Sequence, residues 1–77
     1  MDLQNCYENL ANAIIIQAVK DYRFVLKKLR LNPRDRTAAL EKTSLERFFR
    51  SDDYRSFTSL GGEFLIRRLR EEAKHDS

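Results

Sequence analysis

The 77-residue sequence is poor in residues that interrupt helices, because it holds one proline and two glycines. Its only cysteine, Cys6, has no intrachain partner, so a disulfide within the chain is excluded and a reducing compartment fits best. The longest apolar run, Ala13 to Ile16, is far below the roughly 18 residues of a spanning helix. Met1 to Asn5 lack the basic and apolar regions of a signal peptide. We therefore expect a cytoplasmic protein without a membrane segment.

Length and charge restrict the organisation of the chain. A chain this short forms a single domain, residues 1–77, and buries only about 60% of its unfolded surface. Fifteen Lys and Arg residues against twelve Asp and Glu residues give a net charge of only +3. Such a balance is typical of a solvated, ion-paired surface. An anion-binding site therefore depends on local clustering of cations.

The spacing of apolar residues predicts a long first helix. From Leu3 to Arg30 these residues recur at steps of three and four, which is the period of an α-helix. They are Leu3, Tyr7, Leu10, Ile14, Ala18, Tyr22, Val25 and Leu29. We expect one helix of about seven turns, with Asp2 as its N-cap and with cations in its last turns, where they suit the negative end of the helix dipole.

A turn at residues 32–35 separates this helix from a second one. Asn32 and Pro33 disfavour the helical conformation, so the chain reverses there. The second helix should run from Arg34 or Asp35 to Arg50. A reversal through so short a turn predicts that the first two helices pair as an antiparallel hairpin.

Two shorter helices should complete an all-α fold. Ser51 is an expected N-cap for a short helix from Asp52 to Phe57, because acidic residues follow it in the first turn. The turn that contains Gly61 and Gly62 then leads into an amphipathic C-terminal helix, Glu63 to Lys74.

The middle of the first helix predicts self-association. Ala13 to Ile16, together with Val19, is apolar on more than one side, and a helix of that kind is buried on more than one side. A chain this small offers few elements to cover it, so we expect an oligomer. Alternatively, the C-terminal helices of the same chain cover both sides.

Residue types that carry catalysis are scarce. The only histidine, His75, lies at a polar chain end, where a stable pocket is not expected. Gly61 and Gly62 lack the Lys and Ser/Thr of a phosphate-binding P-loop. We predict a protein that is not an enzyme and that uses neither a metal nor a cofactor.

Basic residues occur in two patterns that suit an anionic ligand. Lys20, Arg23, Lys27 and Arg30 recur at helical spacing along the first helix, as a possible phosphate track or, more commonly, as a solvated face. The segment from Arg47 to Thr58 instead alternates three arginines with four aromatic residues across a helix start. Arginine forks match phosphate oxygens, helix starts offer free N–H groups, and aromatic rings stack on bases.

The second pattern gives the candidate ligand-binding residues. They are Arg47, Arg50, Ser51, Tyr54 and Arg55, joined by Arg67 and Arg68 if the last helix folds back. The alternative interpretation is that Phe48, Phe49 and Phe57 belong to the core while the arginines pair with neighbouring acids.

Three stretches carry a resemblance to a known group of proteins. They are Ala18 to Arg23, which follows the Ile-rich part of the first helix, Glu46 to Tyr54, and Gly62 to Ile66. In these stretches the chain resembles small uncharacterised helical proteins encoded by phages and integrative elements of Gram-positive bacteria. Relatives often have an aromatic residue at the position of Asp53, so a stacking contact there would be absent.

The resemblance implies an accessory protein that acts by stoichiometric binding. Our leading interpretation is a non-enzymatic counter-defence protein in the host cytoplasm, which binds an anionic ligand, such as a nucleotide signal, as a helical oligomer. One alternative is an inhibitor that binds a host defence protein directly. Another is a small DNA-binding regulator, in which the last two helices resemble a helix-turn-helix.

Overall fold

The computed structural model describes the backbone of residues 3–75 and the side chains of residues 12–75. It contains α1 (Leu3–Leu31), α2 (Arg36–Phe49), α3 (Asp52–Phe57) and α4 (Gly62–His75). Residues 3–75 form no strand, and the predicted all-α fold is confirmed. The predicted N-cap Asp2 lies outside the described residues.

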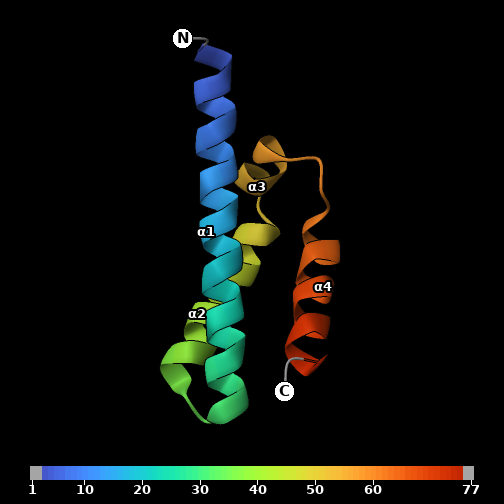
Figure 1. Ribbon diagram of the computed structural model, residues 1–77. Coiled ribbons are helices and arrows are strands. Elements are labelled where there is room, and N and C mark those ends of the chain that lie inside the picture. Colours follow the sequence, from blue (N-terminus) through green and yellow to red (C-terminus); the bar gives the residue numbers. More distant parts are fainter. Residues whose placement is uncertain (1–2, 76–77) are drawn as a thin grey trace.

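The long helix α1 sets the shape of the molecule (Figure 1). Its 29 residues span about 43 Å at 1.5 Å per residue, close to the longest dimension of 46 Å, whereas the other two dimensions are 23 and 21 Å. The helices α2, α3 and α4 all pack against α1. The N-terminal end of α1 extends past α3 in Figure 1, so the shorter helices accompany only part of its length.

Local hydrogen bonds explain where the middle helices begin. Asp35 caps α2, because its Oδ1 accepts a 3.1 Å bond from the backbone N–H of Ala38. Ser51 caps α3 in the same way, through a 3.2 Å bond from the N–H of Tyr54 to its Oγ. Both residues have extended backbone conformation, as N-caps do. The predicted cap and bounds of the third helix are confirmed.

All four helices contribute to one core. Its buried residues are Ala18, Tyr22, Phe49, Tyr54, Ile66 and Leu69. The Phe49 ring packs edge-to-face on Tyr22 and on Tyr54, with centroid distances of 5.6 and 5.7 Å. Pairs of this geometry add about 0.5–1.5 kcal/mol each beyond the burial of their area. The aromatic cluster therefore joins the end of α2 to both α1 and α3.

The segment from Ala13 to Val19 is covered on one side only. Ile15 and Val19 are half-buried against the core, whereas Ile16 remains 53% exposed and Ile14 remains 37% exposed. The helices of the same chain therefore do not cover both sides of this segment.

Candidate functional site

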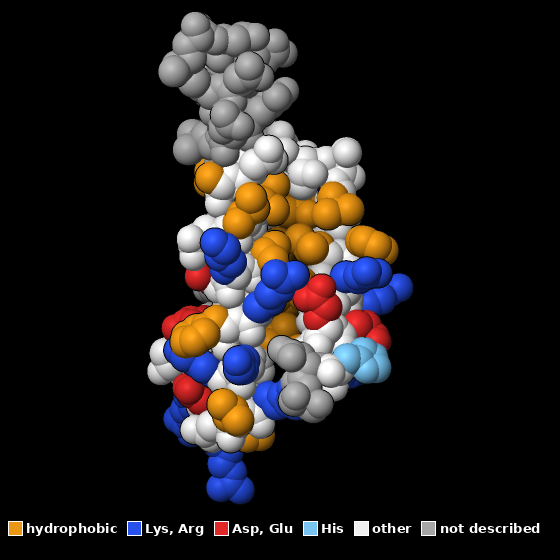
Figure 2. All heavy atoms as spheres, in the orientation of Figure 1, with side chains coloured by type: hydrophobic (Ala, Val, Ile, Leu, Met, Phe, Trp, Pro, Cys, Tyr) orange, Lys and Arg blue, Asp and Glu red, His pale blue; other side chains and the backbone are white. Residues whose placement is uncertain are grey.

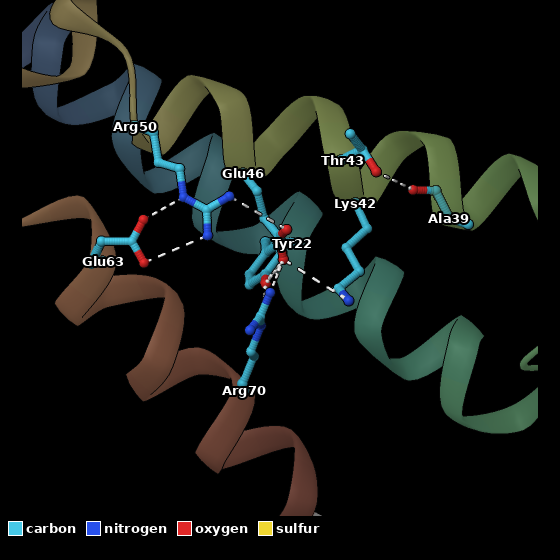
Figure 3. Close-up of polar contacts among 8 residues, drawn as sticks. All are labelled: Tyr22, Ala39, Lys42, Thr43, Glu46, Arg50, Glu63 and Arg70. Atoms are coloured by element: carbon cyan, nitrogen blue, oxygen red, sulfur yellow. Dashed lines mark hydrogen bonds and ion pairs between the residues drawn. The ribbon is translucent and has the colours of Figure 1, made fainter.

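At the junction between α2 and α4, the guanidinium of Arg50 lies between two acidic side chains (Figure 3). Its guanidinium donates hydrogen bonds to both carboxylate oxygens of Glu63, and its Nη1 lies 3.9 Å from Oε1 of Glu46. The hydrogen bond from Arg50 holds the pKa of Glu63 below its ordinary value of 4.5. Arg50 is therefore compensated by carboxylates of the same chain.

Two other predicted residues have structural roles at this junction. Besides capping α3, the Ser51 hydroxyl donates a 2.6 Å bond to the carbonyl oxygen of Phe48. Tyr54 is only 1% exposed, and within the described part of the chain its hydroxyl has no hydrogen-bond partner. Burial raises the pKa of Tyr54. Its ring packs in the core and is not free to stack on a base.

The four remaining predicted residues lie on the surface. Nη1 of Arg55 lies 3.5 Å from Oδ1 of Asp52, and both side chains are largely exposed. Arg47, Arg67 and Arg68 are also exposed.

A hollow of about 400 Å³ lies beside the junction, and its lining includes Arg50 and Arg55 together with Glu63. The structure thus brings two of the seven predicted residues to one hollow, where a carboxylate accompanies them. Phe49 packs in the core, and Arg50 and Arg55 pair with acidic side chains, as the alternative interpretation expects.

A polar cluster that the sequence did not predict joins three helices (Figure 3). The Tyr22 hydroxyl donates a 2.6 Å bond to Oε2 of Glu46, and Nη2 of Arg70 donates another of 2.6 Å to the same oxygen. Nε of Arg70 donates a 3.3 Å bond to the Tyr22 hydroxyl. Burial, followed by the bond to Glu46, raises the pKa of Tyr22 to about 12. This cluster fixes Arg70 at the edge of a larger basic surface.

That surface lies between α1 and α4. Two hollows of about 220 and 470 Å³ share Arg30 and Ala73 in their linings. We call them together the basic groove, because their cationic residues are Arg23, Lys27, Arg30, Lys42, Arg70 and Lys74. Their apolar residues are Leu26, Leu29, Leu69 and Ala73. Figure 2 shows Lys and Arg side chains along α1 on the face where α4 lies beside it.

Contacts across the basic groove hold its two walls together. Nε of Arg23 lies 3.1 Å from a carboxylate oxygen of Glu72, and Nη1 of Arg30 donates a 3.1 Å bond to the carbonyl oxygen of Ala73. Arg23, Lys27 and Arg30 belong to the series of cations that the sequence places at helical spacing along α1. The groove cations of α2 and α4 join them only through folding. Helical spacing therefore identified one wall of the groove and not the other.

Comparisons with family models, with curated proteins and with solved structures found no match for this chain. Among the described residues, no helix is both long and apolar enough to cross a membrane.

Proposed function

We propose that this chain is a non-enzymatic binding domain for a small anionic ligand, such as a nucleotide signal, and that the ligand binds in the basic groove. The main support for the proposal is the concentration of positive charge at this groove. Six cations line the groove, and two carboxylates, Glu46 and Glu72, are bound to them. The entire chain has a net charge of only +3, so its positive surplus is concentrated at this groove.

The chemistry of the groove suits a ligand with one charged and one apolar part. Lys27 and Lys74 form no ion pair among the described residues and supply cations for phosphate oxygens, and the guanidinium of Arg30, which donates one bond to the carbonyl oxygen of Ala73, retains N–H groups for a phosphate. Leu26 and Leu29 provide apolar surface within reach of the same cations. A volume of about 470 Å³ falls in the range of small-molecule sites. A nucleotide combines phosphate with a flat, weakly polar base and therefore matches both parts.

The biological role in this proposal is that of a counter-defence or other accessory protein of a phage or mobile element, acting in the host cytoplasm. The sequence resemblance supports this role, and sequestering a signal requires stoichiometric binding without catalysis. In the same proposal, α1 and α2 form an antiparallel hairpin that serves as a scaffold. The binding-competent form is a helical oligomer.

Calorimetry with a panel of cyclic and linear nucleotides tests the proposal. We expect at least one nucleotide to bind the wild-type chain, and the double variant Lys27→Gln/Lys74→Gln to bind it about tenfold more weakly or worse, since each lost phosphate contact removes on the order of 1 kcal/mol or more. Both lysines are exposed, so the fold should persist. The matched control is Lys20→Gln/Arg36→Gln, which removes two exposed cations outside the groove lining. Absence of binding at millimolar concentration of every nucleotide contradicts the proposal.

Direct inhibition of a host defence protein is the second candidate function. It is favoured by Phe24 and Leu40, which are 60% and 71% exposed although both are large and apolar. A partner protein that buries such side chains would form a stable complex without a small ligand. Capture of a defence protein by the wild-type chain and not by Leu40→Glu, in the absence of nucleotide, would favour this candidate over the basic groove.

A DNA-binding regulator is less well supported, because α3 has only six residues and its Arg55 lies beside Asp52. Gel shifts at two salt concentrations distinguish it, since binding through several phosphates weakens steeply with salt.

A further inference from the structure

A hollow of about 410 Å³ lies between α1 and α2, outside the basic groove. Its lining includes Asp21 of α1 together with Leu40, Glu41 and Leu45 of α2. We call it the acidic hollow, because both charged residues in its lining are acids. Asp21 and the groove residue Arg23 are two positions apart on α1, which places them about 200° apart around the helix axis. The acidic hollow and the basic groove therefore lie on opposite sides of α1.

The acids of this hollow lack the cationic partners that other carboxylates of the chain have. Glu46, Glu63 and Glu72 each pair with an arginine. Within the described part of the chain, the side chains of Asp21 and Glu41 form no ion pair, and Asp21 accepts a 2.9 Å hydrogen bond from a neutral amide, that of Gln17. Cations outnumber acids in the sequence, yet none lines this hollow. Its charge is therefore complementary to a positively charged partner.

The α2 wall of the hollow has the length and spacing of a surface that binds another helix. Its lining positions follow Thr37 at steps of three, four, seven and eight residues, which is one face of a helix. From Thr37 to Leu45 this face is about 12 Å long. Leu40 on it is 71% exposed, whereas Leu45 is half-buried against the core. An amphipathic helix recognises such a face by placing its own apolar side chains along it.

We propose that the acidic hollow binds a helical segment of a partner protein, in which lysine or arginine residues flank apolar ones. The cations of the segment pair with Asp21 and Glu41, and its apolar side chains cover Leu40. The basic groove repels the same segment, because the charges there have the same sign. The proposal does not rest on an anionic ligand. It defines the chemistry of the partner that the second candidate function leaves open.

Fluorescence anisotropy with a labelled amphipathic helical peptide of leucine and lysine tests the proposal. We expect the full chain to bind this peptide, and not to bind the same peptide with glutamate in place of every lysine. Asp21→Asn/Glu41→Gln should raise the dissociation constant about threefold to tenfold, as the loss of two exposed ion pairs does. Leu40→Gln should raise it about tenfold or more, because the leucine is no longer buried by the peptide. All three side chains are exposed, so circular dichroism should show unchanged helix content.

Two control variants separate the acidic hollow from general charge and from the basic groove. Asp53→Asn/Glu71→Gln removes the same two charges from exposed positions outside the hollow, and should leave peptide binding unchanged. Lys27→Gln/Lys74→Gln impairs the basic groove and should bind the peptide at least as tightly as the wild type. The docking of a cationic helix and the binding of a nucleotide can therefore fail separately.

Three results would overturn the proposal. One is absence of binding of the lysine peptide at millimolar concentration. Another is equal weakening by Asp53→Asn/Glu71→Gln and by Asp21→Asn/Glu41→Gln, because attraction between net charges would then explain the binding. The third is a wild-type assembly in sedimentation equilibrium that Leu40→Gln dissociates, because a second copy of the chain would then occupy the hollow.

Discussion

The hydroxyl of Tyr22 donates a 2.6 Å hydrogen bond to Oε2 of Glu46, and this bond joins α1 to α2. Arg70 of α4 binds the same carboxylate oxygen at 2.6 Å, so one acidic side chain connects three helices. The Glu46 side chain is only 13% exposed. A carboxylate with so little access to water requires partners of this kind to remain charged.

Replacing Tyr22 by phenylalanine should destabilise the fold. The substitution removes the hydroxyl but keeps the ring that packs on Phe49, so the loss is that of a hydrogen bond to a charged group. We expect the free energy of unfolding to fall by about 1.5 kcal/mol. In a domain of this size Tm should then decrease by roughly 4–8 °C for each kcal/mol. Urea and thermal unfolding measure both quantities.

Tyr54→Phe is the matched control for that experiment. Tyr54 is as deeply buried as Tyr22, but its hydroxyl has no hydrogen-bond partner among the described residues. Removing an unsatisfied buried hydroxyl should leave stability unchanged or increase it. If both variants lose the same stability, the bond from Tyr22 to Glu46 has no special value.

Stability should fall in acid because of Glu46. Burial alone would raise the pKa of this carboxyl, but hydrogen bonds from Tyr22 and Arg70 hold the pKa below its ordinary value of 4.5. The stabilisation is therefore fully present above pH 4.5 and is lost as the pH falls through the lower value of the folded state. We expect the free energy of unfolding to decrease below pH 4.5, and to decrease less in Glu46→Gln.

High salt should distinguish the contribution of Glu46 to acid-dependent stability from that of Glu63. Glu63 also has a lowered pKa, through its bond to Arg50, but its side chain is 66% exposed against 13% for Glu46. Screening weakens exposed pairs more than buried ones. In molar salt, Glu63→Gln should no longer alter the acid profile, whereas Glu46→Gln still should. Equal screening of both effects would show that Glu46 is solvated like a surface group.

Ser51→Ala should weaken α3 without involving a ligand. The substitution removes the N-cap bond to Tyr54 and the bond to the Phe48 carbonyl. Loss of a serine cap costs about 1 kcal/mol, and unfolding of the purified chain without added nucleotide measures it. Ser59→Ala, at an exposed position before α4, should have no measurable effect. If Ser51→Ala melts at the same temperature as the wild type, capping does not explain the presence of Ser51, and this residue remains a candidate ligand contact.

Local signals in the sequence were sufficient for the helices. The polar cap Ser51, the acids after it and the break at Pro33 act within a few residues, and they placed α3 and the start of α2 correctly to within one or two positions. The packing of one helix against another could not be predicted from such local signals. Arg30 and Ala73 are 43 residues apart, and helical periodicity carries no information about which helix faces the basic residues of α1.

Burial of individual aromatic residues was equally hard to predict. Tyr54 has a polar hydroxyl among arginines and aspartates in the sequence, which suggested an accessible ring. The structure buries it because its ring packs edge-to-face on Phe48 and Phe49 at the end of α2, with centroid distances of 5.9 and 5.7 Å. A helix of six residues contains too few positions for their spacing to show which face is buried.

The two adjacent glycines at the start of α4, Gly61 just before the helix and Gly62 as its first residue, should respond differently to the same substitution. A Cβ atom on Gly62 would overlap the backbone carbonyl oxygen of Phe49 and would lie 2.8 Å from its carbon. Since backbone cannot move aside as a side chain does, Gly62→Ala should push α4 away from the end of α2 and cost about 1–3 kcal/mol. Gly61 has only the Cβ of Phe64 nearby, at 3.9 Å, and its φ is not positive. Gly61→Ala should therefore be neutral or stabilising by up to about 1 kcal/mol. Thermal unfolding of both variants measures the difference, and equal effects would show that α4 does not approach Phe49 so closely in solution.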